Sequence, residues 1–161
     1  MNEPTFAETA DDLLTPADLA SMSGFDFIDR MRTGDLPAPP IAKTLNYRLI
    51  EVAEGRVVFE GAPEFGAYNP LGGAHGGWFG TLLDSCMACA VQTTLPKGRG
   101  YTTIEYKVTI LRPAFVTTPP LKAIGTVVSS GRRVATATGE MIDPDGKIYA
   151  TGTTTCLVFD L

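Results

Sequence analysis

The chain has 161 residues, of which 44% are hydrophobic and 19% are charged, and this favours one ordinary globular domain with a substantial core. Its formal net charge of -5 argues against nucleic acid as the main partner, because phosphate binding needs a basic surface. The 3 cysteines and the lack of a secretion-signal pattern predict a reduced, cytoplasmic protein. The longest apolar run, 78–91, is too short to span a bilayer and predicts a buried helix, so no membrane partner is expected.

Two short helices are predicted near the start of the chain. Thr15, which precedes a proline, and Ser23 are both residue types that cap helix N-termini. A proline-rich linker follows them, because each proline disfavours helical geometry in the residue before it. We therefore predict an N-terminal helical extension with its linker over 1–40 and one main domain over 41–161.

The residue pattern of the main domain predicts an antiparallel sheet around a single long helix. That helix is expected over about 75–92, and it is apolar on almost every side, so the sheet must wrap it. The fold class is therefore α+β, with the strands most simply arranged as a meander. The strands are expected at 44–53, 56–62, 101–112, 121–130, 132–142 and 147–158.

The segment 69–84 combines features that point to chemistry. Its glycine-rich loop carries His75, the single histidine of the sequence, and leads directly into the apolar helix. At a helix start the free backbone N–H groups and the helix dipole favour negative charge. Asp84 lies in the middle of that helix, and a carboxylate among apolar residues usually has a partner or a catalytic role. We predict an oxyanion-stabilising loop with a carboxylate base or nucleophile. The alternative is an aspartate that only satisfies a local backbone group.

The helical rise separates the two halves of this candidate site. Gly76 and Asp84 are eight residues apart, which is roughly 12 Å along a helix. Both groups would have to approach a reacting centre to about 3 Å. Two antiparallel copies of the helix can achieve this, so the sequence predicts an obligate dimer with two shared sites. One face of the helix is small and polar and suits close approach to another helix or a substrate channel; it holds Gly77, Thr81, Asp84, Ser85, Ala88 and Gln92.

Three motifs resemble those of the hotdog-fold thioesterases of the phenylacetate-degradation (PaaI-like) type. They are Asn69-Pro70-Leu71-Gly72, His75-Gly76-Gly77 and Leu82-Leu83-Asp84. The resemblance covers about residues 40–158 and implies a hotdog fold in which the sheet wraps the central helix. It also implies hydrolysis of an acyl-CoA substrate by a homodimer or a pair of dimers, without a cofactor and without a metal.

The resemblance further implies roles for single residues. Asp84 matches the catalytic carboxylate, and Gly76 matches the backbone N–H that polarises the thioester carbonyl. Asn69 matches a residue that orients water or substrate, and His75 matches one that shapes the loop and can hydrogen-bond the thioester. Thr103 matches a hydroxyl near the carboxylate of the partner site.

Strand alternation disagrees with the assignment of Thr103. If the apolar residues at 104, 106, 108 and 110 face the helix, Thr102 rather than Thr103 shares their side. We keep Thr103 as the candidate.

Gly77, Arg132 and Arg133 are the remaining substrate-binding candidates. The arginines would meet CoA phosphates, or they are simply solvated at a turn. Cys86 and Cys89 form a C-x-x-C pair on the buried helix and are predicted to be structural rather than metal-binding or redox-active.

Rival functions differ in class. A serine hydrolase is poorly supported, because the chain has no G-x-S-x-G motif. A non-catalytic acyl-CoA-binding or sensing module stays open, as does, less favoured, a hotdog hydratase or dehydratase.

Overall fold

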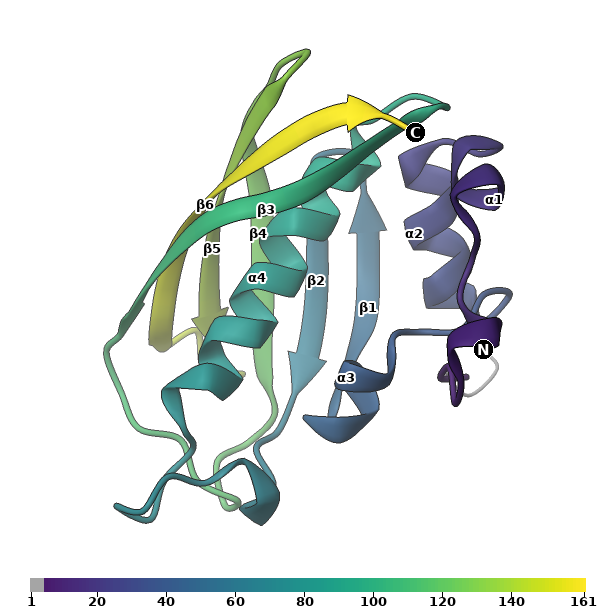
Figure 1. Cartoon of the computed structure of the whole chain (residues 1–161). Coiled ribbons are helices and arrows are strands. Elements are labelled where there is room, and N and C mark those ends of the chain that lie inside the picture. Colours follow the sequence, from purple (N-terminus) through teal and green to yellow (C-terminus); the bar gives the residue numbers. More distant parts are fainter. Residues whose placement is uncertain (1–4) are drawn as a thin grey trace.

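The computed structural model describes residues 5–161, in which a six-stranded antiparallel sheet curves around one long helix, α4 (Figure 1). The predicted fold class is thereby confirmed. The elements in chain order are η1 (Ala10–Asp12), α1 (Pro16–Ala20), α2 (Gly24–Thr33), α3 (Pro40–Thr44), β1 (Tyr47–Ala53), β2 (Arg56–Gly61), η2 (Phe65–Ala67), α4 (Gly76–Thr93), β3 (Arg99–Ile110), β4 (Leu121–Ser130), β5 (Val134–Ile142) and β6 (Ile148–Asp160). No helix among these residues is long and apolar enough to cross a membrane.

The strand order is β1-β2-β4-β5-β6-β3, so the simple meander expected from the sequence is wrong. β2 pairs with β4, while β3 pairs with β6 at the far edge. The reason is that α4 follows β2 and crosses the face of the sheet, which carries the chain to the opposite edge before β3 begins (Figure 1). β1 and β3 are therefore the two edge strands.

α4 is held in the sheet by an apolar core and by a close backbone approach. Trp78, Leu82, Leu83 and Met87 are all buried on the helix. At Gly125 in β4 an added Cβ would lie 2.1 Å from the carbonyl oxygen of Cys86, so any side chain there would push the helix away. The depth of α4 in the sheet, and with it the position of the carboxylate on α4, depends on this contact.

β3 contains a bulge that changes which side chains face α4. The register with β6 shifts between Thr103 and Glu105, which leaves Ile104 without a partner residue. Before the bulge Thr103 faces α4; after it Tyr106 and Ile110 do, while Ile104 is exposed. A one-residue bulge switches the alternation, and this resolves the conflict between Thr103 and the apolar residues that follow it.

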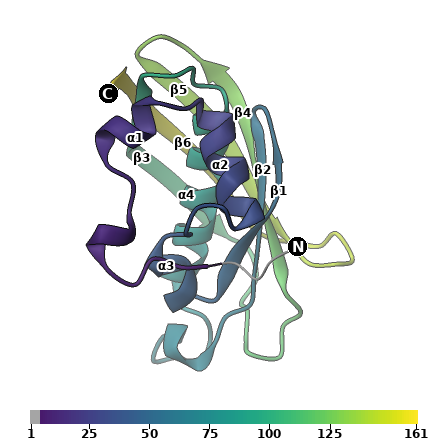
Figure 2. The ribbon, with the colours of Figure 1, turned by 90° about the vertical axis from the view of Figure 1, so that its right-hand side faces the viewer.

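Of the N-terminal helices, α2 packs against α4 and β1, α3 packs against β1, and α1 contacts β3 (Figure 2). The two predicted caps are confirmed: Thr15 accepts the N–H of Asp18, and Ser23 accepts the N–H of Asp26. Ile28 on α2 is buried in the same apolar core as α4. The extension therefore shares the core of the main domain, and the boundary at residue 40 stays a prediction.

α2 meets the end of α4 through a glycine contact. Gly24 donates its N–H to the carbonyl oxygen of Leu95 at 2.9 Å. An added Cβ on Gly24 would lie 1.8 Å from the carbonyl oxygen of Gln92. The small polar face of α4, to which Gln92 belongs, thus does approach another helix closely, and that helix is α2.

Candidate active site

Asn69 braces the glycine-rich loop before α4. Its side-chain Oδ1 accepts the N–H of Leu71 at 2.9 Å and that of Gly73 at 3.4 Å. Its Nδ2 donates to the carbonyl oxygen of Ala74 at 3.4 Å, and Gly72 turns the chain with a φ of 86°. Both ends of the Asn69 amide are therefore engaged with the loop, so within one chain this residue acts on the site through the shape of that loop.

His75 caps the N-terminus of α4. Its Nδ1 accepts the N–H of Gly77 at 2.9 Å, and its carbonyl oxygen accepts the N–H of Trp78. Because Nδ1 is an acceptor, the proton of the neutral imidazole lies on Nε2. The loop-shaping part of the role expected for His75 therefore has a concrete geometry, and the N–H of Gly77 is already occupied.

The N–H of Gly76 is the free donor at this helix start. Among residues 5–161 nothing accepts it, and Gly76 is exposed. It is the first residue of an 18-residue helix, where the unpaired N–H groups and the macrodipole favour negative charge. An oxyanion that reached this position would find an unused, oriented donor.

Asp84 lies half-buried in the middle of α4 and has one hydroxyl partner. The Oγ1 of Thr103 donates to Oδ1 of Asp84 at 3.0 Å. Burial raises the pKa of Asp84, and the hydrogen bond from Thr103 opposes that rise. The structure thus brings Asp84 and Thr103 together within one chain, although the resemblance had associated Thr103 with the partner site. A carboxylate with a raised pKa is a better proton acceptor than an ordinary one.

The residues beside Asp84 are neutral and mostly apolar. Tyr47 Oη and Ser85 Oγ lie 3.1 Å apart and share a hydrogen bond. Burial raises the pKa of the Cys89 thiol to about 12, so this thiol stays protonated near neutral pH. Burial also raises the pKa of Cys86. No cluster of metal-binding side chains occurs among residues 5–161. Cys86 is buried and Cys89 is half-buried, and the raised pKa values make both thiols poor nucleophiles near neutral pH.

The candidate residues form two groups along α4. Asn69, His75 and Gly76 gather at its start, while Asp84 and Thr103 lie eight residues further on, roughly 12 Å along the helix axis. Within one chain the amide and the carboxylate do not meet.

Arg132 and Arg133 lie elsewhere, in the turn between β4 and β5. Ser130, at the end of β4, hydrogen-bonds Thr94 at the C-terminal end of α4, 2.7 Å away. The arginines therefore lie at the end of α4 opposite to the glycine loop.

Sequence reasoning did not select two tyrosines beside α4 as candidates. Tyr47 is buried and reaches Ser85, and Tyr106 lies within van der Waals contact of the Cβ position of Gly80. A tyrosine in a strand is ordinary core composition, so the pattern alone gave no reason to select either one.

A six-stranded antiparallel sheet wrapped around one long apolar helix defines the hotdog class of protein. Residues 71–150 match the family model described as the thioesterase superfamily. The chain is 32% identical to a putative thioesterase, a phenylacetic acid degradation-related protein from Ralstonia eutropha JMP134, with a TM-score of 0.73. That similarity covers 81% of this chain and 98% of the other. The chain belongs to the thioesterase superfamily.

Two further solved structures are similar. One is a mutant of the phenylacetic acid degradation protein PaaI from Thermus thermophilus, at 27% identity and a TM-score of 0.66, covering 73% of this chain and 97% of that one. The other is a hypothetical thioesterase from Streptococcus pneumoniae, solved with coenzyme A, at 23% identity and a TM-score of 0.65. It covers 71% of this chain and 87% of that one, and it supports the fold alone. No curated protein matches the chain.

Proposed function

We propose that the protein is an acyl-CoA thioesterase that hydrolyses its substrate to a free acid and CoA. The observation that carries the proposal is the pairing of an unused N–H at Gly76 with a half-buried carboxylate at Asp84 on one helix. These are the two groups that thioester hydrolysis needs: a donor for the oxyanion and a base or nucleophile. Membership of the thioesterase superfamily supports the reaction, and a protein of this fold has been solved with coenzyme A.

We further propose that a second copy of the chain completes each site. β3 is a 12-residue edge strand, and an unpaired edge of that length invites pairing with another strand. Its side chains Ile104, Tyr106 and Ile110 are 57%, 49% and 44% exposed, which is unusual for large apolar residues on one strand. Antiparallel pairing of two β3 edges around a two-fold axis would run the two α4 helices in opposite directions. Gly76 of each copy would then approach Asp84 of the other.

The chemistry of the proposed site follows from these two groups. Asp84 takes a proton from a water molecule, whose oxygen adds to the thioester carbon. The developing negative charge on the carbonyl oxygen accepts the N–H of Gly76 from the partner copy. The C–S bond then breaks, and the thiolate of CoA leaves and takes up the proton. In the nucleophilic alternative Asp84 adds to the carbon itself, and water then hydrolyses the mixed anhydride.

The reaction is tested by measuring thiol release from acyl-CoAs of short, medium and aromatic acyl groups, with wild type and Asp84→Asn side by side. We expect turnover by wild type and a loss of at least about 100-fold in Asp84→Asn, because a positioned base contributes factors of this size. Binding without turnover on every substrate would favour an acyl-CoA sensor. Turnover that survives the substitution would remove Asp84 from its role. Single-turnover hydrolysis in ¹⁸O-water separates the two mechanisms, since only the nucleophilic route places ¹⁸O in the carboxylate of Asp84.

The shared site is tested by mixing two inactive variants. Gly76→Pro removes the N–H alone, because Gly76 is the first residue of α4, where proline is tolerated, and His75 before it is extended with a ψ of 145°. Gly76→Ala keeps the N–H and is the matched control.

A mixture of Gly76→Pro and Asp84→Asn subunits has one intact site in each mixed dimer if Gly76 and Asp84 come from different copies. Random mixing of the subunits should then restore about a quarter of wild-type activity. No recovery in mixed dimers would place both groups in the same chain. A catalytically active monomer in sedimentation would contradict the dimer as a whole.

A further inference from the structure

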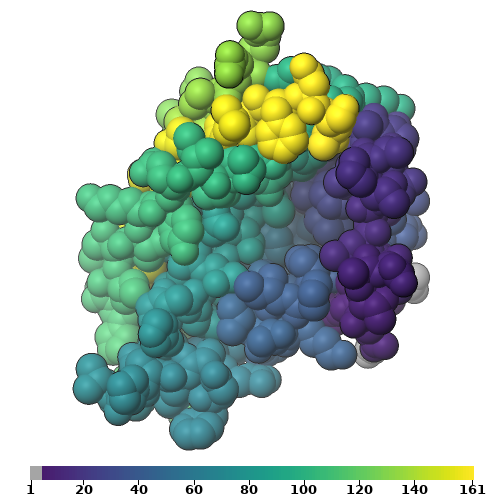
Figure 3. All heavy atoms as spheres, viewed as in Figure 1, coloured from purple at the N-terminus to yellow at the C-terminus, as the bar shows by residue number. Residues whose placement is uncertain are grey.

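A cavity of about 330 Å³ lies between the N-terminal extension and the main domain. Its walls come from α2, β1, α4 and β3, and from the segment that precedes α1. The molecular surface is hollowed at this place, between the N-terminal helices and α4 (Figure 3). None of the candidate residues of the reaction lines the cavity, so it needs its own explanation.

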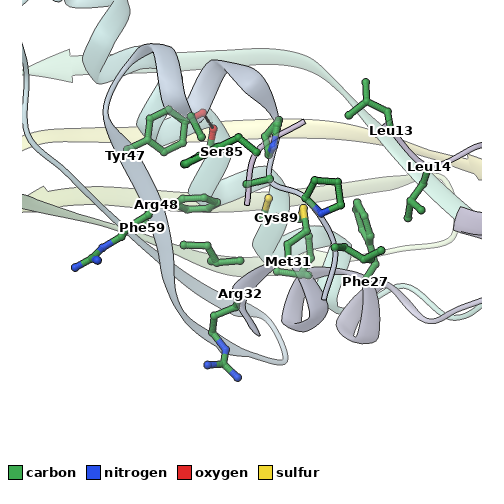
Figure 4. A pocket seen from close by; sticks show the side chains of 18 of the residues that line it. Leu13, Leu14, Phe27, Met31, Arg32, Tyr47, Arg48, Phe59, Ser85 and Cys89 are labelled. Atoms are coloured by element: carbon green, nitrogen blue, oxygen red, sulfur yellow. Dashed lines mark hydrogen bonds between the residues drawn. The ribbon is translucent and has the colours of Figure 1, made fainter. Parts of the chain in front are cut away.

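The cavity runs from the neighbourhood of the carboxylate into the N-terminal extension. Tyr47 and Ser85 lie at one end, Leu13 and Leu14 at the other, and Met31 with Cys89 between them (Figure 4). Ser85 follows Asp84 directly on α4. Tyr101 also lines the cavity and lies two residues before Thr103, so it shares the side of β3 from which Thr103 donates to Asp84, and the inner end of the cavity lies beside the carboxylate.

The walls suit an apolar occupant. The polar groups at the inner end already bind each other: Tyr47 and Ser85 share a hydrogen bond, and the Cys89 thiol stays protonated. The charged side chains at the margin have partners too: Arg32 pairs with Asp29 at 2.7 Å, Arg48 pairs with Glu60 at 3.0 Å, and Asp12 accepts the N–H groups of Glu8 and Thr9. No buried side-chain polar atom among residues 5–161 lacks a hydrogen-bond partner. The cavity therefore offers a ligand no unpaired polar group, and this favours an apolar ligand.

The outer wall is a fixed part of the fold. Gly24 anchors α2 to α4 at a distance that leaves no room for a Cβ, and Ile28 is buried in the main core. Phe6 forms a bridge with Ala38, which ties the start of the described chain to the segment before α3. The extension thus lines the middle of the cavity with Met31 and its far end with Leu13 and Leu14.

We infer that this cavity holds the acyl chain of the substrate, and that the N-terminal extension limits the length of that chain. The inference rests on the proposed function, because it takes the reacting carbonyl to lie at Asp84. An apolar cavity of about 150 Å³ holds benzene, with six carbon atoms. In the same proportion a cavity of about 330 Å³ has room for at most about thirteen carbons. A straight chain fills a cavity less compactly than a ring, so the expected acyl group is a straight medium chain of roughly eight to twelve carbons.

The chain-length profile of kcat/KM tests this inference, measured with acyl-CoAs from four to sixteen carbons. Each buried CH₂ group is worth up to about fourfold, so wild type should improve with every added carbon until the cavity is full, at eight to twelve carbons. Met31→Trp fills the middle of the cavity. It should lower kcat/KM for decanoyl-CoA by at least about tenfold and leave butanoyl-CoA within about twofold.

Two further variants keep the test decisive. Leu13→Trp adds the same bulk at the far end, where the side chain is 48% exposed and folding is safer; it should shorten the preferred chain by a few carbons. Val128→Trp adds the bulk at an exposed position outside the cavity and should leave the profile unchanged. Thermal melting establishes that each variant is folded.

The outcomes separate the inference from the proposed function. If wild type hydrolyses acyl-CoAs and folded Met31→Trp and Leu13→Trp keep its profile, the cavity is not the acyl pocket, and the thioesterase proposal is untouched. A preference of wild type for phenylacetyl-CoA over decanoyl-CoA also overturns the straight-chain assignment.

If wild type hydrolyses nothing, the affinity for acyl-CoAs of each length is measured instead, on wild type and Met31→Trp. A length optimum that Met31→Trp shortens supports the pocket without the reaction. Affinity that is independent of length overturns the pocket.

Discussion

The hydrogen bond between Thr103 and Asp84 makes a quantitative prediction about pH. Thr103→Val keeps the branched shape of the side chain and removes its donor, which lies 3.0 Å from Oδ1 of Asp84. A hydrogen bond to a charged group is worth about 1.5–3 kcal/mol when buried. Asp84 is only half-buried, so the lower end of that range applies, which corresponds to about one pH unit.

The sign of the effect follows from which form the bond stabilises. Thr103 donates to the carboxylate, so its loss favours the protonated acid and raises a pKa that burial has already raised. A general base must be deprotonated, and activity therefore rises with pH through this pKa. We expect the acid limb of the kcat/KM profile to move upward by about one pH unit in Thr103→Val. Activity should fall about tenfold on that limb and change little above it.

The assay follows thioester hydrolysis from pH 4 to pH 9 by the loss of thioester absorbance, which needs no thiol reagent at low pH. Thr103→Ser keeps the hydroxyl, so the acid limb of its kcat/KM profile should lie at the wild-type pH. Thr102→Val removes the neighbouring hydroxyl, which is exposed, and should leave the limb in place. An unshifted limb in a folded Thr103→Val protein, or an equal loss at every pH, would refute the reasoning.

Three further predictions concern stability and assembly. Burial raises the pKa of Asp84 in the folded protein, so the ionised carboxylate lowers the stability of the fold above that pKa. Asp84→Asn should therefore raise the free energy of unfolding at pH 8 and have no such advantage at pH 3. Denaturant titrations at both pH values will check this. Gly24→Ala should destabilise the fold by about 1–3 kcal/mol because its Cβ has no room, whereas Gly66→Ala, with nothing within 4 Å, should change the melting temperature little. Ile104→Glu at the bulge of β3, where the side chain is 57% exposed, should yield inactive monomers in sedimentation, and Val128→Glu, exposed elsewhere, should leave both mass and activity unchanged.

Local sequence signals predicted most of the elements, because they act over a few residues. The caps at Thr15 and Ser23 and the span of α4 needed only residue types and helical periodicity. The strand order could not be obtained in the same way, since the path of α4 across the sheet depends on long-range packing such as the Gly125 contact. The bulge at Ile104 is a second example: pattern reasoning assumed unbroken alternation and so questioned Thr103 without cause.

The candidate site was predictable in parts for a related reason. The separation of Gly76 and Asp84 follows from the helical rise alone. The free N–H of Gly76 does not, because it depends on His75 taking the neighbouring N–H of Gly77 instead. The cavity could not be predicted from the sequence, because its walls bring together residues more than fifty positions apart, such as Met31 and Cys89.

The glycine contact that fastens α2 to α4 separates two properties of the molecule. The proposed reacting groups lie on α4 and β3, where a one-residue insertion would turn the carboxylate by about 100° in both copies at once. The far wall of the cavity lies on a different segment, and only its side-chain volume matters there. If the cavity holds the acyl chain as proposed, exchanging one apolar side chain for another within the first forty residues will change the substrate preference and leave the proposed reacting groups in place.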